Sequence, residues 1–171
     1  MTYLKLCLVT LMLSTLGFAV TPFTLPLMNG SATDGANFSS STHPNTVFVV
    51  EAYFLDCPYC NDNASNVDDL ASKYASEPRV QVLDVGVDRT VSQYQQWISR
   101  HHPNHPVLMD AKRALIGQLG TSGYPSTYVI DCRYNVTKST SGEWDGSMEN
   151  SLMSAIDAAL KTDCSTDIFE E

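Results

Sequence analysis

The chain has 171 residues, of which 43% are hydrophobic and 17% are charged. This composition is typical of a globular protein with a single core rather than of a disordered chain. The formal net charge is −9, whereas binding to a nucleic acid backbone requires clustered lysines and arginines. We therefore expect no nucleic acid partner.

The first 19 residues have the pattern of a secretory signal peptide. Lys5 precedes an apolar stretch from Leu6 to Val20, and Gly17-Phe18-Ala19 offers small residues at the two positions that a signal peptidase reads. The stretch has about 15 residues, fewer than the roughly 20 that cross a bilayer. We expect an exported protein, periplasmic or secreted, and retention of the segment as a membrane anchor is the alternative.

The chain has five cysteines, and Cys7 falls within the expected signal peptide. The other four allow three pairings. The two-residue spacing between Cys57 and Cys60 favours a bond between them. This leaves Cys132 and Cys164 as a candidate structural disulfide, with two separate buried thiols as the alternative.

Residues 20–45 are rich in small and polar residues. Within them, Phe23 to Leu27 followed by Asn29-Gly30 predicts a short strand that enters a hairpin turn. We expect this N-terminal hairpin extension to precede one domain at residues 46–164, which an acidic tail at residues 165–171 follows.

Within the domain, hydrophobic patterns alternate between those of strands and those of helices. Near-continuous apolar runs predict buried strands, and apolar residues three or four apart predict helix faces. We expect strands at Thr46–Leu55, Val80–Val87, Pro106–Met109, Ser126–Asp131 and Val136–Trp144, and helices at Cys60–Tyr74, Val91–Arg100, Ala114–Leu119 and from an N-cap at Ser147 to Leu160. This alternation predicts an α/β fold with a central mixed sheet and helices on both of its faces.

The motif Cys57-Pro58-Tyr59-Cys60 lies where the first long strand is expected to end and a helix to begin. The N-terminus of a helix stabilises an anion, and the thiolate is the reactive form of cysteine. We expect Cys57 to be the exposed, attacking thiol. Cys60, one turn into the helix and less exposed, would resolve the mixed disulfide. Pro58 suits the first helical turn, which does not need its N–H group.

A cysteine pair of this spacing is also compatible with half of a zinc site. Such a site needs a second pair of ligands, and the only cluster, His101, His102 and His105, is more typical of a solvated loop. We expect no metal and no cofactor apart from the disulfide itself. The alternative is a metal-handling or redox-inert binding domain.

A second motif, Gly123-Tyr124-Pro125-Ser126-Thr127, leads into a predicted strand. In these two motifs and in their order, the chain resembles the thioredoxin-like superfamily over about residues 22–162. Pro106-Val107-Leu108-Met109-Asp110, Tyr128-Val129-Ile130-Asp131 and Pro22-Phe23-Thr24-Leu25 are similar to the bacterial envelope branch of the TlpA and ResA type. Peroxidase chemistry is disfavoured, because the residues before Cys57 lack the Pro and Thr pattern of peroxiredoxins.

The resemblance implies a thioredoxin fold and an oxidoreductase that reduces or isomerises protein disulfides. Its partners would be protein thiols and disulfides, together with an upstream electron donor or acceptor. The resemblance also implies that Pro125 is cis and lies against the redox pair. Tyr124, Pro58 and Tyr59 would contact an extended substrate segment.

The resemblance further implies that Glu51 accepts the proton of Cys60 through water; a strand glutamate that faces solvent is the alternative. The chain departs from the family at Asp56, where the family has Trp, and at Asp84, near a common Lys position. A carboxylate beside Cys57 opposes thiolate formation, and Pro58-Tyr59 is found in glutaredoxins and some isomerases. The direction of electron flow therefore stays open at this point.

Overall fold

The computed structural model describes residues 18–29 and 36–164, so the expected signal peptide before residue 18 and the acidic tail lie outside the described residues. None of the helices in these ranges is long and apolar enough to cross a membrane. The elements are β1 (Thr24–Pro26), β2 (Asn37–Ser39), the 3-10 helix η1 (Ser40–Thr42), β3 (Val47–Tyr53), α1 (Pro58–Lys73), β4 (Val80–Gly86), α2 (Val91–His101), β5 (Val107–Met109), β6 (Ser126–Ile130), β7 (Val136–Ser141) and α3 (Gly146–Ala159).

The central strand β3 belongs to a five-stranded sheet with the order β5-β4-β3-β6-β7. It pairs in parallel with β4 and antiparallel with β6. β5 extends the parallel half and β7 the antiparallel half. All seven residues of β3 are buried, as its apolar sequence predicts. The predicted mixed sheet is confirmed, and the redox motif follows the end of its central strand.

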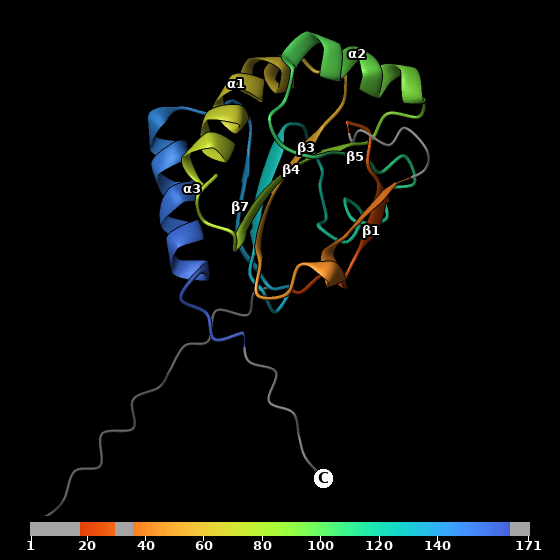
Figure 1. Cartoon of the computed structure of the whole chain (residues 1–171). Helices are drawn as coiled ribbons and strands as arrows, with labels where there is room; N and C mark the ends of the chain where they lie inside the picture. Colours follow the sequence, from red (N-terminus) through yellow and green to blue (C-terminus); the bar gives the residue numbers. More distant parts are fainter. Residues whose placement is uncertain (1–17, 30–35, 165–171) are drawn as a thin grey trace, which may run out of the picture.

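All three helices pack on one face of this sheet (Figure 1). Val47 and Val49 of β3 share a core cluster with residues of α1 and α3. Trp97 of α2 stacks on Tyr53 of β3, with ring centroids 4.0 Å apart. Side chains two residues apart share a face of a strand, so the three helices meet the same face. Helices thus flank the sheet as predicted, but on one face instead of two.

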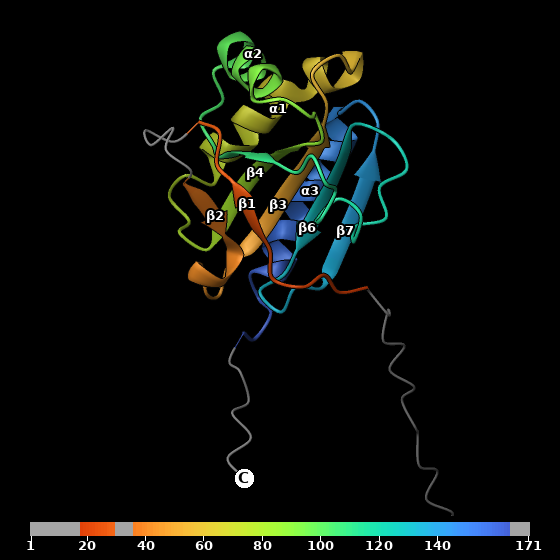
Figure 2. The same cartoon turned by 90° about the vertical axis from the view of Figure 1, so that its right-hand side faces the viewer.

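The opposite face is covered by the N-terminal hairpin and by residues 111–120. Figure 2 shows β1 and β2 lying across this face. Phe23, Leu25 and Phe38 are buried there, and the ring of Phe23 meets that of Phe48 edge-on at 5.6 Å. The predicted hairpin extension is confirmed, since β1 and β2 are antiparallel. It replaces the helices that we expected on this face.

Residues 27–36 join the two strands, and Gly30 of the expected Asn29-Gly30 turn lies outside the described residues. Asn29 donates to the carbonyl oxygen of His105 at 2.7 Å and accepts from the N–H of Val107 at 2.9 Å. Leu27 also forms a β-bridge with Leu108. The segment therefore covers the edge of β5, which would otherwise expose unpaired backbone groups.

Residues 114–119 form turns rather than the predicted helix. The carboxylate of Asp110 accepts hydrogen bonds from the N–H groups of residues 114–116, at 2.6 to 2.9 Å. Arg113 and Gly120, on either side, have φ angles of 56° and 66°. A right-handed helix cannot continue through these left-handed residues, which therefore bound the segment on both sides.

The N-cap of α3 is Asp145 rather than Ser147. Its Oδ1 accepts a hydrogen bond from the N–H of Met148 at 2.7 Å. A carboxylate suits this position because it satisfies an open N–H group and lies at the positive end of the helix dipole. The predicted cap was therefore wrong by two residues.

A disulfide joins Cys132, in the turn after β6, to Cys164, beyond the end of α3. The Cα atoms are 5.8 Å apart. Both cysteines are partly exposed, and they lie far from the redox motif in the chain. The pairing inferred from spacing is the one that the structure contains.

Candidate active site

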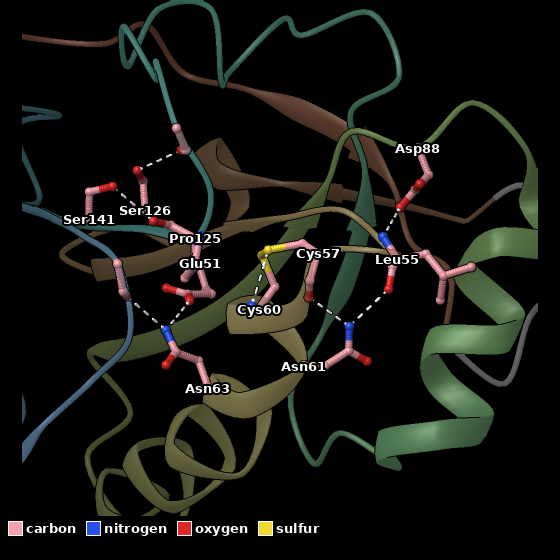
Figure 3. Close-up of a disulfide and its surroundings, with 12 residues drawn as sticks. Glu51, Leu55, Cys57, Cys60, Asn61, Asn63, Asp88, Pro125, Ser126 and Ser141 are labelled. Carbon is pink, nitrogen blue, oxygen red and sulfur yellow. Dashed lines mark hydrogen bonds between the residues drawn. A yellow bond between two sulfur atoms is a disulfide. The ribbon is translucent and has the colours of Figure 1, made fainter.

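Cys57 is the N-cap residue of α1 and forms a disulfide with Cys60 (Figure 3). Their Cα atoms are 5.2 Å apart, and Cys57 Sγ accepts a hydrogen bond from the N–H of Cys60 at 3.1 Å. Pro58 is the first residue of the helix, where a missing N–H group is not needed. The motif therefore lies at a helix N-terminus, which stabilises a thiolate.

Cys57 and Cys60 are each only 2% exposed. The expectation that Cys57 is the more exposed of the two is wrong for this disulfide-bonded state. Phe54 and Tyr124 pack against the cluster that contains both cysteines, and their rings meet edge-on at 5.5 Å. Apolar packing thus limits access to the sulfurs, whereas Tyr59 between them is 55% exposed.

Asn61 fixes the backbone that leads into α1. Its Nδ2 donates to the carbonyl oxygens of Leu55 at 2.9 Å and Cys57 at 2.8 Å. Its Oδ1 accepts from Arg100 Nη1 at 2.6 Å and lies 2.9 Å from His101 Nε2. Because Arg100 and His101 belong to α2, this one side chain ties the redox loop to a second helix.

Asp88 holds the same loop from the end of β4. Its Oδ2 accepts from the N–H of Leu55 at 2.8 Å, and its Oδ1 accepts from Gln93 Nε2 at 2.9 Å. Burial raises the pKa of Asp88, and the charge of Asp56 raises it further. Both sides of the loop are thus fixed by polar side chains.

Glu51 lies on β3 and is 3% exposed. Its Oε2 accepts from Thr127 Oγ1 at 2.6 Å, and its Oε1 accepts from Asn63 Nδ2 at 3.3 Å. Burial raises the pKa of Glu51 to about 8, against the lowering effect of the Thr127 hydrogen bond and with a further increase from Asp84. Glu51 is therefore a buried carboxyl group with a raised pKa, and it does not face solvent.

Asn63 and Trp144 complete the network around Glu51. Asn63 is fully buried, and its Oδ1 accepts from the N–H of Trp144 at 2.8 Å. Trp144 Nε1 in turn donates to Thr127 Oγ1 at 3.0 Å. In Figure 3, Glu51 and Asn63 lie on the side of the disulfide opposite Asn61.

The peptide bond between Tyr124 and Pro125 is cis, as the resemblance implies. The carbonyl oxygen of Pro125 accepts from the N–H of Gly142 at 3.0 Å and from Ser141 Oγ at 3.1 Å. Tyr124 packs against the cluster that contains the two cysteines of the redox motif. The loop with the cis-proline therefore lies next to the disulfide.

The three neighbouring histidines do not converge on one site. His101 faces the redox loop, and His102 is exposed at the end of α2. His105 is buried against Asp84 and Asp68. Among residues 18–29 and 36–164, no group of three or more His, Cys, Asp or Glu side chains has an arrangement that could hold a metal ion.

Sequence reasoning missed the roles of Asn61, Asn63 and Asp88, and it gave Thr127 no role within its motif. A signal existed for Asn63, because position 63 follows Cys60 by three residues on the apolar face of the helix. A polar residue on such a face must find a buried partner. Asn61 and Asp88 contact the backbone of a loop. The spacing of apolar residues in the sequence contains no information on such contacts.

The sequence matches the profile of the AhpC/TSA family over residues 16–139. Because this match covers most of the chain, the protein belongs to the AhpC/TSA family. No curated protein was found to match the sequence.

Three solved structures illustrate the fold. A candidate thiol:disulfide interchange protein DsbE from Chlorobium tepidum is 20% identical, with a TM-score of 0.72 over 84% of this chain and 96% of that chain. A secreted disulfide oxidoreductase of Mycobacterium tuberculosis is 17% identical (TM-score 0.63; 80% and 95% covered). The peroxidoxin BcpB of the same organism is 23% identical (TM-score 0.64; 87% and 97% covered). These similarities confirm the predicted thioredoxin fold.

Proposed function

We propose that this protein is an exported thiol–disulfide oxidoreductase that reduces or isomerises protein disulfides through Cys57 and Cys60. One observation carries the proposal: the disulfide lies at the N-terminus of α1, close to the buried acid Glu51 and to the cis-proline Pro125. A purely structural disulfide needs neither feature, whereas a helix N-terminus stabilises the attacking thiolate and a nearby buried carboxylate can accept the proton of the second thiol.

The reaction starts from the reduced dithiol. The Cys57 thiolate attacks one sulfur of a substrate disulfide, and the other substrate sulfur leaves as a thiolate and takes a proton from water. Cys60 then gives its thiol proton to Glu51 and attacks Cys57 Sγ, which releases the second substrate sulfur. Two electrons have passed from the protein to the substrate, and the product is the Cys57–Cys60 disulfide. An external dithiol reduces it again.

We assign substrate contacts to Tyr124, Pro58 and Tyr59. Pro58 and Tyr59 are exposed beside the buried disulfide, and Tyr124 precedes the cis-proline. An extended substrate segment would pair with the backbone at Tyr124, in a form of β-strand addition. The exposed ring of Tyr59 offers this segment an apolar contact.

The proposed location is the periplasm or the extracellular space, with protein thiols and disulfides as substrates and a separate protein as electron donor. Support comes from the signal-like pattern of residues 1–19 and from the Cys132–Cys164 disulfide, since stable disulfides persist outside the cytosol. The similar oxidoreductase of M. tuberculosis is described as secreted.

The test is the reduction of insulin disulfides by dithiothreitol in the presence of catalytic amounts of the protein. Cys57→Ser should abolish the catalysed rate. Cys60→Ser should accumulate a mixed disulfide with the substrate, visible on a non-reducing gel. The matched control is the double variant Cys132→Ser/Cys164→Ser, which should keep the wild-type rate. A Cys57→Ser variant with full activity would overturn the assignment.

A second candidate is peroxide reduction, because the fold is shared with the peroxidoxin BcpB. Consumption of hydrogen peroxide by the reduced protein separates the two functions. Rapid peroxide consumption that depends on Cys57, together with no catalysis of insulin reduction, would favour the second candidate.

A further inference from the structure

Behind Glu51 lies a second set of buried charges that the proposed reaction does not use. Asp84 is the register partner of Glu51 on the neighbouring strand β4 and is 3% exposed. Residues paired in this way point to the same face of the sheet. Asp84 Oδ2 accepts from Trp97 Nε1 at 2.9 Å. Two carboxyl groups thus occupy adjacent buried positions on one face, and the charge of Asp84 disfavours the ionised form of Glu51.

His105 supplies the compensating positive charge. Its Nε2 lies 3.3 Å from Asp84 Oδ1, and its Nδ1 lies 3.2 Å from Asp68 Oδ1 on α1. Burial alone would lower the pKa of His105, but the adjacent charges of Asp84 and Asp68 raise it above its ordinary value. Asp84 raises the pKa of Glu51, whereas His105 lowers it. The charge that Glu51 experiences therefore depends on the protonation of His105.

His105 also has a route to solvent that does not pass the disulfide. It lines a surface cleft of about 260 Å³ together with Asn104, Tyr74 and Gln81. The side chain of its partner Asp68 is 24% exposed. Protons can thus reach His105 from water at a surface separate from the redox motif.

Other charged groups face this set from α2. The carboxylates of Asp84 and Asp68 act on His101, whose pKa is nevertheless lowered, first by burial and then by Arg100. Arg100 is bound to Asn61. Neither of these α2 side chains contacts Asp84 as His105 does, so His105 is the group whose charge most directly offsets it.

We propose that His105 is a positioning residue for disulfide exchange: through Asp84 it sets the charge beside Glu51 and so couples the base that serves Cys60 to the pH of the solvent. This inference rests on the proposed function for the role of Glu51. His105 and Asp84 thus act on the reaction without contacting either sulfur atom of the disulfide.

The experiment is the titration of the Glu51 carboxyl group, followed by the ¹³C chemical shift of labelled glutamate in the oxidised full-length protein and assigned with Glu51→Gln. His105→Gln should raise the pH of the titration midpoint by about 0.5 pH unit or more, because the charge of Asp84 is no longer offset. Asp84→Asn should lower the midpoint. The control His102→Asn alters an exposed histidine in a left-handed conformation and should leave it unchanged.

The two variants should shift the Glu51 midpoint in opposite directions. This result separates an electrostatic role of His105 from a purely structural one. An unchanged midpoint in His105→Gln, or shifts of the same sign in His105→Gln and Asp84→Asn, would overturn the inference. If His105→Gln does not fold, Asp68→Asn on the surface of α1 replaces it, because it removes one of the two charges that favour protonated His105 and should also raise the midpoint.

The acid limb of the pH profile for insulin reduction should move with the Glu51 midpoint in each variant, and an acid limb that stays in place would also overturn the inference. Failure of the proposed function is a different result, namely full exchange activity in Cys57→Ser. The carboxyl titration requires no turnover, so the two failures are distinguishable.

Discussion

Thr127 Oγ1 donates a hydrogen bond of 2.6 Å to Glu51 Oε2, and the two residues are register partners in the antiparallel pair of β3 and β6. Thr127 follows the cis-proline by two residues, and Glu51 precedes the redox motif by six. The two sequence motifs are thus joined at a buried acid. This bond ties Glu51, the proposed proton acceptor, to the strand that follows the cis-proline, and the bond from Asn63 ties it to α1.

Glu51→Gln should slow insulin reduction at neutral pH by about 100-fold, because general acid–base groups typically contribute that much or more. The substitution keeps the size of the side chain but removes its ability to take the Cys60 proton. Glu77→Gln, which changes a partly exposed glutamate bound to Arg79, should keep the wild-type rate. A wild-type rate in Glu51→Gln would exclude Glu51 as the base.

The raised pKa of Glu51 also predicts how the stability of the protein depends on pH. The pKa of Glu51 is raised from 4.5 to about 8 in the folded protein, so the folded state binds this proton more tightly than the unfolded state. The stabilisation is complete below pH 4.5 and is lost as pH rises through about 8. Urea unfolding of the oxidised protein should show this loss, and Glu51→Gln should show a smaller one. An equal loss in both proteins would mean that a group other than Glu51 causes it.

Asn61→Ala should lower the free energy of unfolding by about 1–2 kcal/mol, because two hydrogen bonds to the redox loop and two contacts with α2 are lost. Urea denaturation measures the change. The matched control is Asn66→Ala on the same helix, away from the motif, and its effect should be smaller. Equal effects would mean that Asn61 contributes only helix propensity.

Gly86, at the end of β4, has no room for a side chain. A Cβ atom there would lie 2.6 Å from Tyr94 Cε1 and 2.9 Å from Tyr53 Cζ. Gly86→Ala should therefore destabilise the fold by about 1–3 kcal/mol through overpacking. Gly146, the first residue of α3, meets no atom within 4 Å, so Gly146→Ala should be neutral or stabilising. Thermal unfolding of both variants tests this contrast.

Much of the fold could be predicted from the sequence because its strands are strongly patterned. The apolar run of β3 and the helical spacing after Cys60 each determine an element without tertiary context. The turns at residues 114–119 and the cap of α3 were missed for a different reason. There, the carboxylates of Asp110 and Asp145 accept hydrogen bonds from backbone N–H groups, and periodicity contains no information on such bonds.

The candidate site was predictable to the extent that it lies in contiguous motifs. Cys57, Cys60 and Pro125 lie in such motifs, whereas Asn61 and His105 make contacts between elements that are far apart in the chain. The burial of Cys57 could not be foreseen, because it depends on Phe54 and Tyr124 packing around the disulfide.

The proposed function is tested most sharply by the reduction potential of the Cys57–Cys60 pair, measured by equilibration with glutathione or dithiothreitol redox buffers. We predict a value between about −270 and −180 mV, the range of thioredoxin and of protein disulfide isomerase. A potential near about −120 mV, as in strong oxidants, would reverse the proposed direction of electron flow. A potential below about −300 mV would mark the pair as a structural bridge and contradict a role in disulfide exchange.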